Sequence, residues 1–420
     1  MNEFLRIVVA AIALAAGISA QAATITISCG AVGRELEICR AGAEDWAART
    51  GNTVKLVSTP NSSSERLALY QQLLGARAPE LDVLQIDVVW PGILAAHLVD
   101  LSAAATDVRA DFFPQLVRND TIGERLVALP WFVDVGLLYY RRDLLDRHGV
   151  PVPRTWTELT DVAKRVQQAE RARGASRMWG FVWQGRSYEG LTCDALEWLA
   201  SQGGGTIVDP TGRITVNNPR AASAVTLAAS WVRHISPEGV LNYTEEESRG
   251  IFQSGLAVFM RNWPYAWNLL QSPDSLVRGK VGIARLPAAD DQPHAAALGG
   301  WQLAVSRYSQ HRELATSLVL HLVSRAEQKR RALVGGYHPT IPALYDDADL
   351  LAASPLFAAL RAALDDAVAR PSAAVGADYN RVSYAFANAV HTVLAGQSDA
   401  ESSLRALERQ LRRLKRRGHW

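Results

Sequence analysis

Short strand-like runs alternate with helix-like runs along the chain, and this alternation restricts the fold more than any other feature of the sequence. Polar and apolar side chains alternate over residues 24–27, as in a half-buried strand, and an apolar stripe over the following residues indicates a helix. The next strand is expected at 53–57, a helix at 64–74 and a buried strand at 81–86. Strands that alternate with helices are typical of βαβ units, so the sequence predicts the α/β class.

The pattern continues after residue 130 with longer helices, expected at 156–172 and 219–235. With 420 residues the chain exceeds the length at which one hydrophobic core usually stops growing, so two domains are expected. No Pro-, Gly- or Ser-rich linker is visible between them, which favours two lobes that the chain crosses several times.

Composition and charge exclude several classes of protein. Hydrophobic residues make up 48% of the chain and charged residues 20%, as in an ordinary globular protein. The net charge of +2 is too small for a nucleic-acid-binding surface, so no nucleic-acid partner is expected. The nine histidines show no metal-ligand spacing, and neither a metal nor another cofactor is expected. The 12 tryptophans exceed the 9 phenylalanines, which favours contacts that need an apolar face with a polar rim.

The N-terminus has the features of a secretory signal peptide. Arg6 precedes an apolar run over residues 7–16, and Ala20-Gln21-Ala22 has the form of a cleavage site. Residues 1–22 are therefore predicted to be removed on export to the periplasm or the extracellular space. A retained membrane anchor is the alternative, but the apolar run is shorter than the ~20 residues that span a bilayer.

Three cysteines, Cys29, Cys39 and Cys193, cannot all pair within one chain. Export would permit a Cys29–Cys39 disulfide, but buried free thiols are the favoured expectation. The residues before Cys29 lack the small side chains that precede a lipidated cysteine, so a lipoprotein is not predicted.

At the C-terminal end, residues 402–417 form a basic amphipathic pattern, and a helix of this kind is able to lie on a membrane. The favoured expectation is that this helix docks on its own lobe.

Three motifs combine aromatic side chains with polar groups. The densest is Arg261-Asn262-Trp263-Pro264-Tyr265-Ala266-Trp267, where Pro264 is best tolerated at a helix start that follows a strand. Paired glycines precede Trp301 and allow the backbone to approach a ligand closely. Asp134 lies inside an aromatic strand-like stretch, where a buried carboxylate needs a partner.

Aromatic faces with carboxylates and an arginine are suited to sugars, since the C–H face of a pyranose stacks on indole and its hydroxyls need charge-assisted partners. A glycoside hydrolase uses the same side chains, with two carboxyls ~5–5.5 Å or ~6.5–9.5 Å apart, and Glu35, Asp87 and Asp134 are the candidates for that role. A receptor for a cation or an oligopeptide is the third alternative.

These motifs, together with residues 183–191 and 369–371, resemble the extracellular solute-binding proteins of ABC sugar importers, in particular the trehalose/maltose-binding branch. The resemblance covers nearly the whole chain after the signal peptide. It implies an α/β periplasmic-binding-protein fold with a ligand cleft between two lobes, no catalysis, a monomer, and delivery of a disaccharide to the transmembrane subunits of an importer. The lobes are expected at 23–130 plus about 286–335 and at 131–285 plus about 336–420.

The resemblance also implies which side chains contact the sugar, and the ligand is expected to be an α-linked disaccharide such as maltose or trehalose. The contacts fall on Glu35, Asp87, Asp134, Trp263, Tyr265, Gly300, Trp301 and Arg370.

Two positions depart from the pattern of the relatives. Phe132 stands where they have an aromatic side chain with a hydroxyl group. Glu65 stands beside Arg66 where they tend to carry two consecutive arginines. Phe132 and Arg66 are kept as candidate contacts, and both departures bear on which disaccharide is preferred.

Each candidate residue also has a structural alternative. The tryptophans would fill the core, and Glu35 would simply begin a helix. Asp87 would cap a following helix. Arg370 would pair with Asp365 or Asp366 nearby in the sequence.

Overall fold

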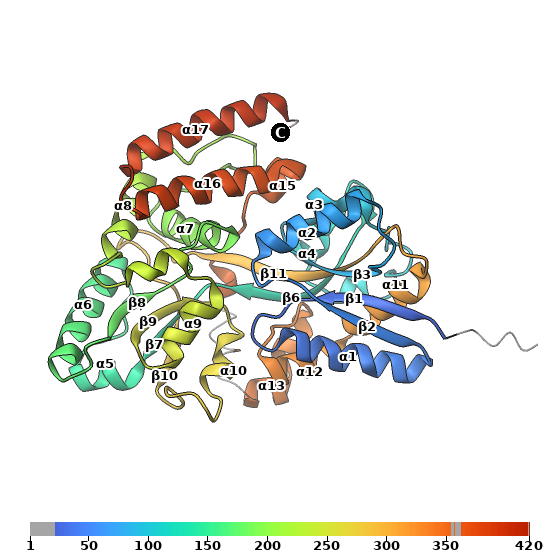
Figure 1. Ribbon diagram of the computed structural model, residues 1–420, viewed down its shortest axis with the longest axis horizontal. Coiled ribbons are helices and arrows are strands. Elements are labelled where there is room, and N and C mark those ends of the chain that lie inside the picture. Colours follow the sequence, from blue (N-terminus) through green and yellow to red (C-terminus); the bar gives the residue numbers. More distant parts are fainter. Residues whose placement is uncertain (1–21, 354–356, 358–362, 419) are drawn as a thin grey trace, which may run out of the picture.

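The computed structural model describes residues 22–353, 357, 363–418 and 420. It shows two α/β lobes side by side, joined by strands that pass from one to the other (Figure 1). The predicted signal peptide lies outside the described residues except for Ala22. Within the described part of the chain, no helix is both long and apolar enough to cross a membrane.

The first lobe is built on the sheet β12-β11-β3-β1-β2, in which β6 also pairs with β11. The β1 strand is parallel to β2 and β3, whereas β11 is antiparallel to both β3 and β6. The strands are β1 (Thr24–Cys29), β2 (Thr53–Ser58), β3 (Val83–Asp87), β6 (Leu129–Val135), β11 (Ala296–Val305) and β12 (Ala367–Val368). The helices of this part are α1 (Glu35–Thr50), α2 (Ser63–Gly75), α3 (Pro91–Leu94), α4 (Pro114–Asn119), α11 (Arg312–Leu322), α12 (Arg325–Gly335) and α13 (Ala348–Ala353), with a small β4–β5 hairpin (Thr121–Ile122, Arg125–Leu126).

The second lobe is built on the sheet β10-β7-β9-β8. Its strands are β7 (Leu137–Arg141), β8 (Trp179–Val182), β9 (Ala257–Asn262) and β10 (Val281–Ala284). Its helices are α5 (Arg142–His148), α6 (Trp156–Ala172), α7 (Glu189–Ser201), α8 (Pro219–Trp231), α9 (Glu245–Gln253), α10 (Ala266–Leu270), α15 (Ser372–Val375), α16 (Tyr379–Leu394) and α17 (Ala400–Arg417). The chain enters this lobe from β6 directly into β7, and it returns through β11. The prediction of an α/β fold with two lobes is confirmed.

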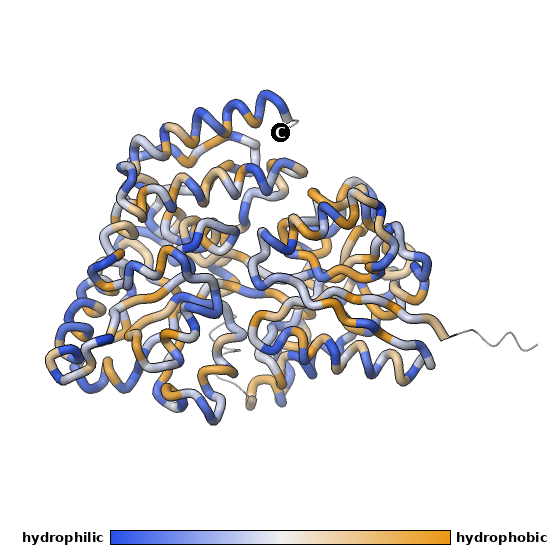
Figure 2. Tube along the Cα trace, in the orientation of Figure 1, coloured by the Kyte–Doolittle hydropathy of each residue, from blue (hydrophilic) through white to orange (hydrophobic). Residues whose placement is uncertain are grey.

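Tryptophans contribute heavily to the core of the second lobe. Trp183 and Trp198 meet edge to face at 5.0 Å, and Trp231 lies 5.7 Å from Trp198 and 5.5 Å from Trp156. All four side chains are almost completely buried. Figure 2 shows the hydrophobic residues concentrated on the strands and on the inner sides of the helices. The tryptophan excess in the sequence therefore reflects core packing as well as the cleft.

The expectation of free thiols at Cys29 and Cys39 is wrong, because these residues form a disulfide. The chain turns back after β1 into α1, which brings the two Cα atoms to 6.5 Å. That separation suits a disulfide. Cys193 is free and buried, as predicted.

The segment after α12 packs on the first lobe, although the sequence analysis assigns it to the second. Tyr337, Leu344 and Leu350 belong to the same apolar cluster as Ile27 of β1 and Ile38 of α1. These side chains cover the α1 side of the sheet, so the chain leaves the first lobe later than residue 335.

The C-terminal helix α17 docks on its own lobe, as expected. Leu404, Leu407 and Leu411 are buried, and the helix packs against α16 and α8. Its apolar stripe is therefore already covered by protein.

Candidate functional site

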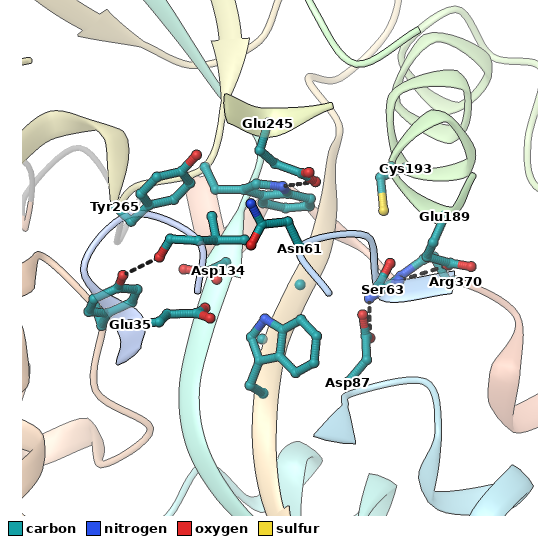
Figure 3. Close-up of a pocket in the computed structure, with 17 residues that line it drawn as sticks. Glu35, Asn61, Ser63, Asp87, Asp134, Glu189, Cys193, Glu245, Tyr265 and Arg370 are labelled. Atoms are coloured by element: carbon teal, nitrogen blue, oxygen red, sulfur yellow. Dashed lines mark hydrogen bonds and ion pairs between the residues drawn. The ribbon is translucent and has the colours of Figure 1, made fainter. Parts of the chain in front are cut away.

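A pocket lies where the two lobes meet. Eight of the ten predicted site residues line it: Glu35, Asp87, Asp134, Trp263, Tyr265, Gly300, Trp301 and Arg370. Figure 3 shows Glu35 and Tyr265 at one end of the pocket and Asp87 and Arg370 at the other, with Asp134 between them. The fold thus brings together side chains that are more than 300 residues apart in the sequence.

The first lobe contributes carboxylates from the ends of secondary-structure elements. Glu35 begins α1 and is buried, and its Oε2 atom has no hydrogen-bond partner. Burial raises the pKa of Glu35 to about 7, although the charge of Arg66 acts in the opposite direction. Asp87 is the last residue of β3, and its Oδ1 accepts a hydrogen bond from the Val89 amide at 3.2 Å.

The connecting strands form the floor of the pocket. Asp134 on β6 is buried, its Oδ1 has no partner, and burial together with the nearby charges of Glu35 and Asp87 raises its pKa to about 8. Gly300 on β11 has φ +134°, and a Cβ atom there would lie 2.5 Å from the Phe132 carbonyl oxygen. Only glycine allows the two strands to approach so closely at this point.

Each pocket tryptophan has a buried arginine behind it. The Arg66 guanidinium lies 4.2 Å from the ring centre of Trp301, and that of Arg261 lies 3.9 Å from Trp263. Arg261 is held in turn by carboxylates inside the second lobe, with Glu197 at 2.5 Å. These cation–π contacts fix the orientation of both indole rings.

Two predicted residues, Arg66 and Phe132, do not line the pocket. Arg66 lies behind Trp301, where its Nη2 donates to the Pro60 carbonyl at 3.1 Å. Phe132 packs against Tyr337 with ring centres 5.0 Å apart, and Tyr337 lines the pocket in its place. Both residues therefore support the pocket from one layer further out.

Arg370 connects carboxylates from both lobes. Its Nη2 lies 2.9 Å from Asp87 and its Nη1 lies 2.8 Å from Glu189 on α7. Ser383 on α16 donates to the other Glu189 oxygen at 2.6 Å. The sequence analysis considered a pairing of Arg370 with Asp366, but Asp366 pairs with Arg285 instead.

The sequence analysis missed several residues that line the pocket. Glu245 is the first residue of α9, and it accepts a hydrogen bond from Trp263 Nε1 at 3.4 Å. Tyr337 follows Gly335 and Gly336, the same glycine–glycine–aromatic pattern that singled out Trp301. Glu189 lies inside one of the runs that carry the family resemblance, but it was not named as a contact. The remaining polar side chains missed are Asn61 and Ser63.

The pocket combines aromatic faces with an excess of hydrogen-bond acceptors. Five carboxylates line it, at positions 35, 87, 134, 189 and 245, together with one arginine. No cluster of His, Cys, Asp and Glu that could hold a metal ion occurs among the described residues. The arrangement is suited to binding a polar organic molecule with an apolar face.

Comparison with known proteins identifies the family. Residues 35–329 match the model of the bacterial extracellular solute-binding proteins. The chain belongs to this family. A "probable ABC transporter-binding protein" of Deinococcus radiodurans is 48% identical over the whole length of both chains.

Solved structures agree with this assignment of a solute-binding protein. The maltose-bound MalE3 of T. maritima is 40% identical, with a TM-score of 0.89 over 94% of this chain and 100% of that one. An ABC transporter solute-binding protein of Agrobacterium radiobacter, in complex with ribitol, is 22% identical, with a TM-score of 0.83 over 93% and 98% of the two chains. The second similarity shows the fold alone.

Membership of the family determines the general role of the protein. Extracellular solute-binding proteins bind a small ligand and deliver it to the membrane subunits of an ABC transporter, and they are not enzymes. The glycoside hydrolase alternative is therefore set aside. The family also implies a periplasmic or extracellular location.

Proposed function

We propose that this solute-binding protein binds an α-linked disaccharide, such as maltose or trehalose, and delivers it as a monomer to an ABC importer. The observation that carries the proposal is the pair of tryptophans in one pocket, with Trp263 following β9 of the second lobe and Trp301 on β11. Two indole faces in one pocket suit the C–H faces of two sugar rings. The maltose-bound MalE3, at 40% identity, supports the same class of ligand.

The acceptors around the tryptophans suit the hydroxyl groups of a sugar. Because burial raises the pKa of Glu35 to about 7 and that of Asp134 to about 8, each carboxyl can hold a proton near neutral pH. A protonated carboxyl donates one hydrogen bond and still accepts another, as a sugar hydroxyl requires. The same raised pKa values make the pocket less suitable for a cation, despite its excess of acidic residues.

Capture is proposed to proceed by closure of the lobes over the sugar. Contacts between the lobes already exist beside the pocket: Glu65 of α2 pairs with Arg186 at 2.6 Å, and Ser64 Oγ accepts from the Glu189 amide at 3.1 Å. An open form would lack these contacts, and β6 and β11 would act as the hinge. The sugar drives closure only through its higher affinity for the closed form.

Isothermal titration calorimetry with maltose, trehalose, sucrose, mannitol and a polyamine tests the proposal. Binding of mannitol or the polyamine without any disaccharide would refute it. Trp263→Ala and Trp301→Ala are each expected to weaken disaccharide binding by ~1–3 kcal/mol, because an aromatic stacking face is lost. Trp267→Ala is the matched control, since Trp267 belongs to the same aromatic motif but does not line the pocket. Unchanged affinity in both pocket variants would also contradict the proposal.

A further inference from the structure

The C-terminal helix α17 concentrates positive charge. It carries seven basic and two acidic residues, a net charge of +5, whereas the whole chain carries +2, so the rest of the chain carries −3. Ligand binding does not account for this asymmetry, because the pocket lies between the lobes and contains no residue of α17.

The apolar side of α17 is already occupied. Leu404, Leu407 and Leu411 pack on α16 and α8, so the helix cannot insert these side chains into a bilayer. Lys415 Nζ donates to the Gly212 carbonyl at 2.6 Å and fixes the C-terminal part of the helix on the lobe. In Figure 2 the hydrophilic residues of α17 form the outer edge of the molecule above α16. The charged side is therefore held in place and faces outward.

Four arginines on this outer side form no salt bridge with a described residue. Arg409, Arg413, Arg416 and Arg417 are exposed and their side chains donate no hydrogen bond to any residue that the structure describes. The pKa of nearby Glu408 is nevertheless lowered by its hydrogen bond from Arg412 and also by the charge of Arg409. The other two arginines of the helix are neutralised by Glu401 and Glu408. The spacing of i, i+4, i+7 and i+8 places the four side chains on one face, about 12 Å long. They are called here the basic face of α17.

We propose that the basic face of α17 docks on an anionic phospholipid surface. Protein interfaces rely on buried aromatic and apolar anchors, but the other exposed side chains within residues 409–417 are Gln410 and the paired Arg412, and the exposed residue one turn earlier is Ala406. Guanidinium groups on a rigid helix instead match a layer of phosphates, which they bind through paired N–H donors. Because α17 lies on the outside of the second lobe, the docked protein keeps its pocket free and stays close to the membrane that holds its importer.

Vesicle co-sedimentation tests this proposal. The purified protein without residues 1–22 is mixed with vesicles of phosphatidylcholine alone or with added phosphatidylglycerol, at low and at high salt. The test variant replaces the four arginines of the basic face with glutamine. The control variant, R109Q/R177Q/R278Q/R325Q, removes the same charge from four exposed arginines elsewhere that form no salt bridge or side-chain hydrogen bond within the described residues.

Wild type and control are expected to bind the phosphatidylglycerol vesicles at low salt and to be released at high salt. The test variant is expected to bind at least about 20-fold more weakly, because each arginine near an anionic surface contributes about fivefold and two of the four already account for about 25-fold. Equal binding by the test and control variants, or no binding by the wild type, would overturn the proposal. Binding only to vesicles that contain the importer would also overturn it, in favour of an acidic protein partner. Calorimetry with the sugar and thermal unfolding should be unchanged in the test variant, which separates this result from the proposed function.

Discussion

Replacing Glu35 with glutamine should stabilise the protein at alkaline pH, although Glu35 lines the pocket. Burial raises the pKa of Glu35 from 4.5 to about 7, so the folded protein holds a proton that the unfolded chain releases. Glu35 therefore leaves the free energy of unfolding undiminished below about pH 4.5. The free energy of unfolding then falls as the pH rises from about 4.5 through about 7. Because each pKa unit corresponds to about 1.4 kcal/mol, the ionised carboxylate costs the fold about 3 kcal/mol at pH 8. Glu35→Gln removes that cost.

Urea unfolding followed by tryptophan fluorescence, at pH 4.5 and pH 8, measures the difference. Glu35→Gln should exceed the wild type by about 3 kcal/mol at pH 8 and by less than about 0.5 kcal/mol at pH 4.5. Glu37→Gln is the control, because the side chain of Glu37 is 62% exposed on the same helical turn and its loss should change little at either pH. A difference between Glu35→Gln and wild type that is the same at both pH values would refute the reasoning.

Two further predictions concern covalent and ionic links. Replacing Cys29 and Cys39 with alanine should lower the free energy of unfolding by about 3 kcal/mol, because the disulfide closes a loop of about ten residues; an unchanged urea midpoint would contradict this. Glu65→Arg should speed maltose release about two- to fivefold in stopped-flow fluorescence, because it breaks the exposed ion pair with Arg186 between the lobes. The double variant Glu65→Arg/Arg186→Glu should restore the rate, and equal rates in all three proteins would contradict a role for the pair.

The local parts of the fold could be predicted from sequence because periodicity is a local property. The strand expected at 53–57 is β2 (Thr53–Ser58), and the helix expected at 64–74 is α2 (Ser63–Gly75). The helix expected at 156–172 is α6, which begins with a capping box formed by Thr155 and Glu158. The pairing of β6 with β11 was not predictable in this way, because it joins segments more than 150 residues apart.

The kinds of side chain in the candidate site could be predicted from the sequence, but not which of them reach the pocket. Phe132 and Asp134 are two residues apart on β6, so a strand places both on the same side of the sheet. Only Asp134 reaches the pocket, because the ring of Tyr337 covers Phe132. Tyr337 comes from a segment that the sequence analysis assigned to the other lobe. Which side chain of a strand is exposed to the pocket thus depends on a distant segment that packs over the strand. A local sequence pattern contains no information about that segment.

Arg370 shows most clearly that the ion-pair partners of a side chain cannot be predicted from their closeness in the sequence. Asp365 and Asp366 are its nearest acidic residues in the chain, yet its guanidinium binds Asp87 and Glu189, which lie 283 and 181 residues away. The fold decides the outcome, because a buried arginine requires buried carboxylates and these two reach it from different lobes. In the proposed opening of the lobes, either Asp87 or Glu189 would lose this cation. The ion pairs that build one wall of the pocket would then also stabilise the proposed closed form.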